Sequence, residues 1–420
     1  MREMKDSGIE WVGEIPEEWT KDKVIRLFNI IGSGTTPKNI TSDFPCVNWI
    51  QSGDINGSLI SDCKNNISKS IVSQYSALKI YAAPFIVIAM YGASVGNISI
   101  SLINGCVNQA CCVLSTSICN LNYAFYAIKS SQNYLVRKAI GGGQPNINQD
   151  TIKQLWLPLP ALPEQERIAA FLDAECAEID AVLEKTRASI EEYKKLKQAV
   201  ITQAVTKGIR GDRPMKDSGI EWIGDIPAEW SVVRIKNLFD YRNERNFRPL
   251  DEVNLISLYT DKGVVQHCDL EETTGNKASN ADGYKLVYEN DIVVNIILCW
   301  MGAIGRSAYC GVTSPAYDVY SPKQGINSKF YHYLFRTNGF SGDCYKVGRG
   351  IMAMRWRTYS DQFRAIKVVF PSQSEQEEII KYLDEKCAGI DALITKKQQY
   401  LTEIENYKKS LIYEYVTGKK

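Results

Sequence analysis

A segment of sixteen residues occurs twice in this chain, and this repeat constrains the possible folds more than any other feature. MKDSGIEWVGEIPEEW begins at Met4 and MKDSGIEWIGDIPAEW begins at Met215, with thirteen of sixteen positions identical. The offset between the two copies (215 − 4) recurs much later, where Glu164 matches Glu375. Because repeats of this kind reflect one structural plan used more than once, the sequence predicts two halves with a common frame.

Between the repeated segments lie two stretches of nearly equal length and different residue content, 24–155 and 235–366. Short apolar runs separated by turn residues predict a mixed α/β fold in both of them. Examples are FIVIAMYGASVGNISIS from Phe85 and YKLVYENDIVVNIILCWMGAIG from Tyr284. One frame with two different inserts suits a target that has two different parts at a fixed separation.

A long helix is expected after each insert. The two segments begin near Pro163 and Pro371 and end near Gly208 and Gly418, the residue types expected at helix starts and ends. About 46 residues at ~1.5 Å per residue give a rod of roughly 70 Å.

Apolar residues recur every seven positions in both helices and in the same phase, which predicts a coiled coil. Since one helix leaves the first insert and the other must return, we expect an antiparallel pair with pseudo-twofold symmetry. The alternative is that each helix belongs to a separate domain core. Polar residues in the seam are expected to fix its register: Thr186, Lys197, Lys397 and Lys408. The apolar seam is formed by Leu172, Cys176, Ile179, Leu183, Ile190, Tyr193, Val200 and Ala204, and by Leu383, Cys387, Ile390, Ile394, Leu401, Ile404, Leu411 and Tyr415.

Composition narrows the functional classes. The 49 Lys and Arg residues are balanced by 48 Asp and Glu residues, so any basic surface must be local. The 12 cysteines contain no CxxC pair and there are 2 histidines, which gives little support to a zinc site or a disulfide framework. Reduced thiols, no signal core and apolar runs too short for a bilayer lead us to expect a cytoplasmic protein without a membrane partner.

Glycine-rich polar segments of the first insert hold candidate nucleic-acid contacts. Glycine lets the backbone approach a ligand closely, and Asn and Gln amides pair with adenine edges in the major groove. Ordinary solvated turns have the same composition, and this alternative stays open. The candidates are Thr36, Lys38, Gln51, Asn97, Gln144, Asn146 and Asn148.

The second insert holds the densest basic stretch of the chain. Arginine binds guanine or phosphate, and the neighbouring aromatic residues Trp356 and Tyr359 are expected to pack along sugars or bases. A solvated basic surface is the alternative. The candidates are Arg242, Arg245, Lys323, Arg349, Arg355 and Arg357.

Tryptophans are retained in both copies of the repeated segment, and we interpret them mainly as packing anchors. A second interpretation is that each copy docks one of two identical partner subunits, because pseudo-symmetric surfaces bind identical subunits. The candidates for docking are Trp11, Trp19, Trp222, Trp230, Glu164, Gln165, Glu375 and Gln376.

The motifs of common catalysts are missing from the sequence. There is no GxxxxGK[ST] phosphate loop, no HExxH, no zinc-deaminase pattern and no asparagine-proline-proline-aromatic tetrapeptide of adenine methyltransferases. We therefore expect a protein that is not an enzyme.

Taken together, these motifs resemble the specificity subunits of type I restriction-modification enzymes over nearly the whole chain. The resemblance rests on the repeated MKDSGIEW-x-G-x-IP-x-EW segment, and on LP-x-LPEQ-x-x-IA-x-FLD (159–173) with its counterpart FPSQSEQEEIIKYLD (370–384). WIQSGDI (49–55) and GAIG-x-S with SPAY (302–317) resemble recognition-domain segments of the family.

The resemblance implies an α/β (α+β) fold in which a long antiparallel two-helix coiled coil separates two mixed α/β target-recognition domains. The expected ranges are 1–160 and 211–370 for the domains, and 161–210 and 371–420 for the helices.

Each recognition domain would read one half of a bipartite, asymmetric double-stranded DNA site. Two modification subunits would methylate adenine with S-adenosylmethionine, and restriction subunits would use ATP and Mg; no cofactor is assigned to this chain. The alternatives are an accessory specificity component of a solitary methyltransferase and a two-headed scaffold that does not bind DNA.

Overall fold

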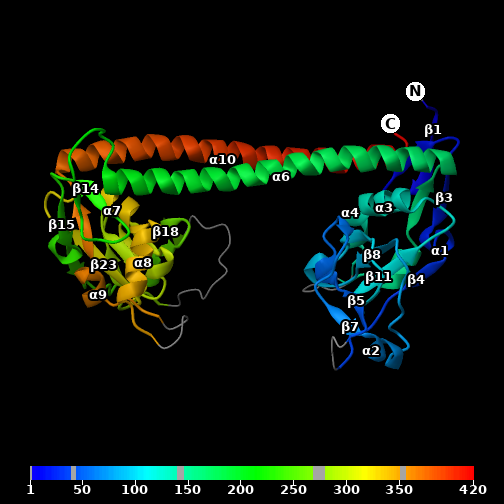
Figure 1. Cartoon of the computed structure of the whole chain (residues 1–420), viewed down its shortest axis with the longest axis horizontal. Coiled ribbons are helices and arrows are strands. Elements are labelled where there is room, and N and C mark those ends of the chain that lie inside the picture. Colours follow the sequence, from blue (N-terminus) through cyan, green and yellow to red (C-terminus); the bar gives the residue numbers. More distant parts are fainter. Residues whose placement is uncertain (1, 39–43, 140–145, 268–279, 351–355) are drawn as a thin grey trace. The chain divides into compact units, whose positions relative to one another are not determined.

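The structure is a computed structural model of the chain and describes residues 2–38, 44–139, 146–267, 280–350 and 356–420. The chain forms two compact units, the first made of Met1–Arg187 with Gln399–Lys420 and the second of Ala188–Gln398. Each unit contains one copy of the repeated segment, one insert and part of both long helices (Figure 1). Helices and strands are mixed in both inserts, which confirms the predicted fold class.

The first unit is built on a five-stranded sheet of order β4-β11-β8-β9-β6 and a three-stranded sheet of order β10-β5-β7. Its strands are β1 (Met4–Ile9), β2 (Gly13–Pro16), β3 (Thr20–Lys23), β4 (Ile30–Gly32), β5 (Cys46–Ile50), β6 (Leu59–Ile60), β7 (Asn66–Ser68), β8 (Phe85–Ala89), β9 (Ile98–Ser101), β10 (Gly105–Val107), β11 (Cys111–Ser115) and β12 (Trp156–Leu159). Its short helices are α1 (Val24–Leu27), α2 (Lys69–Gln74), α3 (Leu121–Ser130), α4 (Gln132–Arg137) and α5 (Gln149–Lys153).

The second unit has a four-stranded sheet of order β16-β23-β20-β21 and several two-stranded sheets. Its strands are β13 (Met215–Asp217), β14 (Asp225–Pro227), β15 (Ser231–Arg234), β16 (Phe239–Arg242), β17 (Ile256–Tyr259), β18 (Gly263–Gln266), β19 (Lys285–Val287), β20 (Ile292–Asn295), β21 (Ile304–Arg306), β22 (Gly311–Thr313), β23 (Tyr317–Pro322) and β24 (Lys367–Phe370). Its short helices are α7 (Ser328–Phe335), α8 (Asn338–Val347) and α9 (Ser360–Ala365).

The two inserts share an architecture that their residues do not reveal. The order β4-β11-β8-β9 of the first unit corresponds to β16-β23-β20-β21 of the second. The middle strands β8 and β20 are buried along their whole length and pair antiparallel on both sides. Two helices follow each sheet, and a short third helix, α5 or α9, comes before the last strand. The inserts therefore differ in sequence and agree in plan.

Each insert begins and ends on two adjacent antiparallel strands. In the first unit β3 pairs with β12, with Lys23 opposite Trp156. In the second unit β15 pairs with β24, with Arg234 opposite Lys367. Both members of the second pair lie one repeat offset beyond those of the first, so the register is the same in both units.

The two long helices are α6 (Leu162–Lys207, 46 residues) and α10 (Gln373–Val416, 44 residues). The sequence predicted that α10 starts near Pro371, and the helix begins just beyond this residue. The Ser372 hydroxyl caps its start by accepting a hydrogen bond from the Glu375 amide at 3.4 Å. The helices end as expected, since Gly208 (φ 74°) and Gly418 (φ 70°) follow them in the left-handed conformation that glycine favours.

The predicted seam is confirmed within each unit. In the first unit Leu172 and Leu411 are 0% and 4% exposed, and the Phe171 and Tyr415 rings stack at 4.3 Å. In the second unit the seam residue Leu383 is 0% exposed. The two long helices therefore pack on each other, and the alternative of separate cores without mutual contact is wrong.

Ion pairs fix the direction of this packing. In the first unit Asp180 of α6 pairs with Lys408 of α10, and in the second unit Lys197 of α6 pairs with Asp391 of α10, both at 2.6 Å. As the residue number rises along α6, the number of its partner on α10 falls, which is the mark of an antiparallel pair. Two of the three seam lysines, Lys197 and Lys408, each neutralise an aspartate, as expected for residues that specify register.

Candidate functional site

The described ends of the two candidate loops, from Asn146 and from Trp356 onward, occupy the same position in their units. The Ile147 amide donates to the Met90 carbonyl at 2.9 Å, and the Thr358 amide donates to the Ile296 carbonyl at 2.9 Å. Both acceptors directly follow a middle strand, β8 or β20, and both loops lead into the short third helix. Ile147 and Thr358 are separated by the repeat offset, so the structure places these loops as counterparts.

Asn146 and Arg357, the candidates preceding these two residues, form isolated antiparallel bridges with Tyr91 and Arg349. Asn146 is exposed and Arg357 is half-buried. Two further candidates, Gln144 and Arg355, lie outside the described residues.

The bridge between Arg349 and Arg357 brings two guanidinium groups to one side of a short ribbon. Each amide donates to the other residue's carbonyl, at 2.8 and 2.9 Å, so the two residues lie directly opposite each other. Like charges in this position repel, and within the described ranges neither side chain has an ion-pair partner. This arrangement is suited to an anionic ligand.

An aromatic pair supports the ribbon. The Trp356 ring stacks on Tyr345 with 4.9 Å between centroids, and its indole N–H donates to the Tyr345 carbonyl at 3.1 Å. Tyr345 is 49% exposed. Arginines beside a partly exposed aromatic pair provide the chemistry for contacts with phosphates and bases.

Two candidates of the first insert hold backbone or neighbouring side chains. Asn97 donates to the Ile55 carbonyl at 3.3 Å and accepts from the Gln132 amide at 3.1 Å. The Asn148 side chain caps α5 by accepting from the Thr151 amide at 2.8 Å. Both side chains position neighbouring segments within the first unit.

The other candidates of the first insert lie on its surface. Thr36 donates to the Gln109 side chain at 2.6 Å, and Lys38 is exposed. Gln51 is half-buried and its amide oxygen accepts from Asn65 at 3.3 Å.

In the second insert, Arg242 is engaged within the chain. Its guanidinium binds Asp291 at 2.9 Å and Glu244 at 2.6 Å, and it lies 4.6 Å from the centre of the Tyr288 ring. Burial raises the pKa of Asp291, and the bond to Arg242 opposes this shift. The main visible role of Arg242 is therefore to neutralise a buried carboxylate.

Arg245 and Lys323 make fewer contacts within the chain than Arg242 does. Arg245 is exposed and donates to the Gly283 carbonyl at 3.0 Å. Lys323 is half-buried, donates to the Lys236 carbonyl at 3.0 Å and pairs with Asp240 at 3.5 Å.

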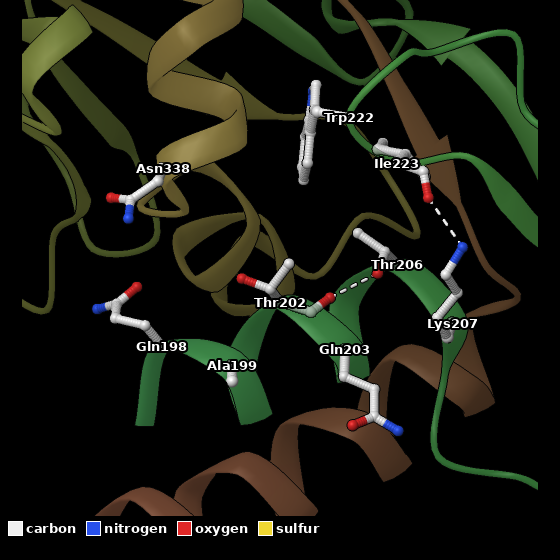
Figure 2. A pocket seen from close by; sticks show the side chains of 9 residues that line it. All are labelled: Gln198, Ala199, Thr202, Gln203, Thr206, Lys207, Trp222, Ile223 and Asn338. Carbon is white, nitrogen blue, oxygen red and sulfur yellow. Dashed lines mark hydrogen bonds between the residues drawn. The ribbon is translucent and has the colours of Figure 1, made fainter. Parts of the chain in front are cut away.

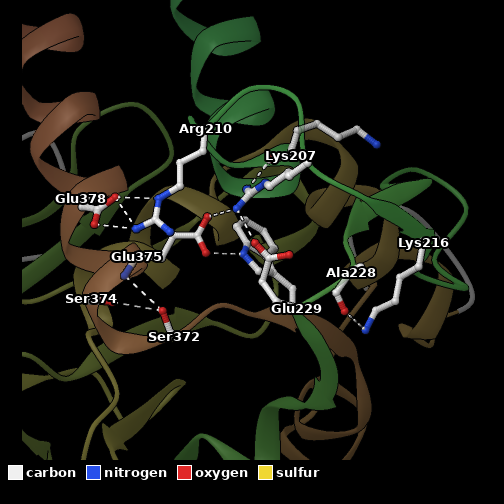
Figure 3. Close-up of polar contacts among 11 residues, drawn as sticks. Lys207, Arg210, Lys216, Ala228, Glu229, Ser372, Ser374, Glu375 and Glu378 are labelled. Carbon is white, nitrogen blue, oxygen red and sulfur yellow. Dashed lines mark hydrogen bonds and ion pairs between the residues drawn. The ribbon is translucent and has the colours of Figure 1, made fainter.

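A buried ion pair fastens the repeated segment of the second unit to the start of α10. The Glu375 carboxylate, 2% exposed, accepts from the Trp230 indole at 2.7 Å and from Arg213 at 2.5 Å. Figure 3 shows Glu375 near Glu378, which binds Arg210. Arg213 also donates to the Lys207 carbonyl at the end of α6, at 2.8 Å. One arginine therefore connects the repeated segment to both long helices.

We call these contacts between a repeated segment and the start of a long helix the joint. The first unit has the same joint in a more exposed form. Trp19 donates to Glu164 at 3.1 Å, and Arg2 pairs with Glu164 at 2.7 Å. The Arg2 side chain is 45% exposed, whereas that of Arg213 is 10% exposed. Sequence reasoning missed these arginines, although they are separated by the repeat offset.

The repeated glutamines complete the joint. Each amide oxygen accepts from the backbone N–H of an asparagine that caps α3 or α7, and each amide nitrogen donates to a proline carbonyl. The partners are Asn120 and Pro160 for Gln165, and Asn327 and Pro371 for Gln376. Five docking candidates are buried and present no surface to a partner in this structure: Trp19, Trp230, Gln165, Glu375 and Gln376.

Trp11 and Trp222 are half-buried, and their surroundings differ. Trp222 borders a groove of about 510 Å³ whose lining includes Thr202 of α6 (Figure 2). In the first unit the counterpart of Thr202 is Tyr413, and its hydroxyl donates to the Val12 carbonyl next to Trp11 at 2.8 Å. The larger side chain occupies this position in the first unit.

The described residues contain no group of three or more His, Cys, Asp or Glu side chains that could hold a metal ion. No helix within them is long and apolar enough to cross a membrane.

Several known proteins resemble this chain in sequence. The type I restriction enzyme MjaVIII specificity subunit of Methanocaldococcus jannaschii is 26% identical over 314 residues, covering 71% of this chain and 69% of that protein. The type I restriction enzyme EcoDI specificity subunit of Escherichia coli is 24% identical over 355 residues, covering 77% and 76%.

Solved structures agree in fold. A chain from a study of complex assembly and conformational transition of the type I R-M system has a TM-score of 0.71 at 14% identity, covering 96% of this chain and 99% of that one. The HsdS subunit from Thermoanaerobacter tengcongensis has a TM-score of 0.51 at 16% identity, covering 96% and 98%.

The family described as type I restriction modification DNA specificity domain matches twice, at residues 16–192 and 227–403. The two matches are offset by the same interval as the sequence repeat, and together they span most of the chain. The chain therefore belongs to the family of type I restriction-modification DNA specificity proteins.

Proposed function

We propose that this chain reads a bipartite, asymmetric double-stranded DNA site, with one unit for each half-site. The observation that carries the proposal is the equivalent placement of the loops that contain Asn146 and Arg357, each beside the end of a middle strand. One loop is rich in glycine and amides and the other in arginine. Two reading loops in the same place with different chemistry suit two half-sites of different sequence.

The long helices serve as a spacer in this proposal. Each is a single uninterrupted helix, α6 of 46 and α10 of 44 residues, and both units share the same antiparallel register. With pseudo-twofold symmetry, such a pair would hold two reading heads at a set distance and rotation along the duplex. A change of one helical turn corresponds to ~5.4 Å and would alter the preferred gap between half-sites.

The chemistry is assigned to partner subunits, so the chain itself is not an enzyme in this proposal. Two modification subunits would methylate adenine with S-adenosylmethionine, and restriction subunits would use ATP and Mg²⁺. This chain has no phosphate-binding loop in its sequence, which supports the assignment of nucleotide chemistry to partners. Trp11 and Trp222, which are half-buried, stay the candidates for docking the two modification subunits.

The test compares Asn146→Ala with Arg357→Ala in cells that contain the modification subunits. Genome-wide mapping of methylated adenine would give the recognition motif for the native protein and for each variant. We expect Asn146→Ala to relax one half of the motif and Arg357→Ala to relax the other, because losing a base contact costs ~1–3 kcal/mol. Arg234→Ala, a variant of an exposed stem arginine, is the control and should leave the motif unchanged.

Two results would refute the proposal. One is a methylation pattern that does not depend on the gene for this chain. The other is a motif that both loop variants change in the same half.

A further inference from the structure

A basic side chain at the end of α3 or α7 holds a loop of its insert in each unit. Lys129 donates to the Gly57 carbonyl at 2.8 Å. Arg336 donates to the carbonyls of Thr260 at 3.0 Å and Asp261 at 2.8 Å. In both cases a cation reaches backbone oxygens of a loop that is distant in sequence.

The two cations are structural counterparts. Lys129 follows the asparagine that caps α3 by nine positions, and Arg336 follows the asparagine that caps α7 by nine positions. The interval between the two cations is slightly shorter than the repeat offset, because the inserts differ in length before these helices. A search of the sequence at the repeat offset therefore does not detect them.

Each of these helices is also fastened to a long helix. Tyr126 of α3 donates to Asp173 of α6 at 2.8 Å, and Tyr333 of α7 donates to Asp384 of α10 at 2.7 Å. The repeated glutamines already hold the caps of α3 and α7. Each helix thus connects a long helix to a loop of the insert.

Lys129 lies where a charge is disfavoured. Burial together with the nearby Lys408 lowers its pKa to about 8, whereas the Phe125 ring, whose centre is 5.1 Å from the ammonium, attracts a cation. Cys176 and Asp180 of α6 also face it. Burial lowers the pKa of Arg336 as well. A buried cation is costly, so its presence at the same position in both units indicates a specific role for it.

The loops held by the cations are fixed from a second side. The Gly57 amide donates to Ser99 at 3.2 Å, and Asn97 holds Ile55 of the same segment. Gly57 has a φ of 89°, a conformation that suits glycine. The segment begins at Gln51, which is a candidate for DNA contact.

In the second unit the held residues form the turn between β17 and β18. Arg336 also donates to the Ile304 carbonyl on β21 at 3.1 Å, so it ties this hairpin to the main sheet. A single side chain therefore sets the position of the hairpin relative to α7.

We propose that Lys129 and Arg336 are positioning residues for DNA recognition, each fixing one loop of its unit to the long helices so that it determines selectivity for one half-site. The inference rests on the proposed function and adds to it the residues that connect reading to the helical frame. Neither side chain is placed in contact with DNA.

The experiment measures binding of the full-length chain, assembled with its modification subunits, to three duplexes. One carries the site found by methylation mapping, and each of the others has one half-site scrambled. Lys129→Met keeps the length of the side chain and removes the donor, and Lys129→Arg keeps a donor. Arg336→Met and Arg336→Lys are the matched pair in the second unit.

We expect Lys129→Met to reduce selectivity for one half-site by about tenfold, because a hydrogen bond from a charged group is lost, and to leave the other half-site unchanged. Arg336→Met should do the same for the other half-site. Lys129→Arg and Arg336→Lys should restore most of the selectivity. The dependence of affinity on salt should not change, since no phosphate contact is removed.

Loss of selectivity for both half-sites, no rescue by the conservative variants, or a salt slope reduced by about one charge would overturn the inference. Gly57→Ala provides a second route if Lys129→Met does not fold, because it strains the same loop and leaves Lys129 in place. It should reduce selectivity for the same half-site, and unchanged selectivity would count against the inference. A native protein without any half-site preference would instead overturn the proposed function itself.

Discussion

The joint between the repeated segment and the long helices gives the sharpest prediction for stability. Replacing Arg213 by Met leaves Glu375 charged, 2% exposed and without its arginine. Removing one partner of a buried ion pair costs ~3–5 kcal/mol, because the remaining charge is neither solvated nor compensated. The indole of Trp230 still donates to Glu375, so we expect the lower end of this range, about 3 kcal/mol.

The first unit supplies the control. Arg2 pairs with Glu164 in the same joint, but their side chains are 45% and 15% exposed. Exposed pairs contribute ~0–1 kcal/mol, so Arg2→Met should cost less than about 1 kcal/mol. Both substitutions remove the arginine from a glutamate that a tryptophan also binds, and Arg213→Met additionally removes the hydrogen bond to the Lys207 carbonyl.

Hydrogen exchange measured by mass spectrometry reports local opening free energies in both units of one sample. Arg213→Met should lower the opening free energy of the first turns of α10 and leave the start of α6 unchanged. Equal effects of the two substitutions, or an effect of Arg213→Met below about 1 kcal/mol, would refute the argument from burial.

Three further predictions concern other parts of the chain. The pKa of Lys129 is about 8 in the folded chain and 10.5 in its ordinary state, so between these pH values the unfolded chain binds more protons than the folded chain. The free energy of unfolding should therefore rise with pH across this window by ~3 kcal/mol because of this lysine. The difference in unfolding free energy between the native protein and Lys129→Met should change by this amount across the window, and a constant difference would contradict the linkage. Gly339→Ala places a Cβ in steric overlap with the Trp222 ring. The free energy of unfolding should therefore fall by more than ~1 kcal/mol, and the tryptophan fluorescence spectrum should shift. An unchanged spectrum would count against this prediction. Replacing both Lys197 and Lys408 by Leu should raise the melting temperature of the helical pair, measured by circular dichroism, because polar residues in the seam cost stability. A lower melting temperature would show that the ion pairs of these lysines outweigh that cost.

The helical frame could be predicted because its signals are local and repeated. Heptad spacing from Leu172 to Ala204 is read within one segment, and its recurrence from Leu383 to Tyr415 doubles the evidence. The glycines after α6 and α10 fixed their ends, whereas the start of α10 depended on the Ser372 cap and lay just beyond Pro371. Boundaries set by one side-chain hydrogen bond are harder to predict than periodicity.

The common sheet of the inserts could not be predicted, because strand pairing is not local. The pairing of β8 with β11 in the first unit corresponds to that of β20 with β23 in the second, at an interval that differs from the repeat offset. Burial on both faces also lets many apolar residues occupy β8 and β20. Different sequences therefore satisfy one architecture.

The binding candidates show what composition leaves undetermined. Arg242 and Arg349 both belong to basic stretches, yet Arg242 neutralises the buried Asp291 and Arg349 faces a second arginine. The amides of Asn97 and Asn148 are suited to base contacts, yet both side chains bind backbone groups of the first unit. Side-chain type indicates which bonds are possible, and only the tertiary fold decides which bonds form.

The paired stems, β3 with β12 and β15 with β24, have a consequence for how such chains diversify. An insert enters and leaves its unit through neighbouring strands whose ladder is formed by backbone atoms, so its two ends stay adjacent whatever lies between them. Genetic recombination with crossovers in these stems would exchange a whole insert. The buried contacts between the repeated segment and the long helices would be retained. New DNA specificity would then arise by replacing a cassette, without redesign of the protein that carries it.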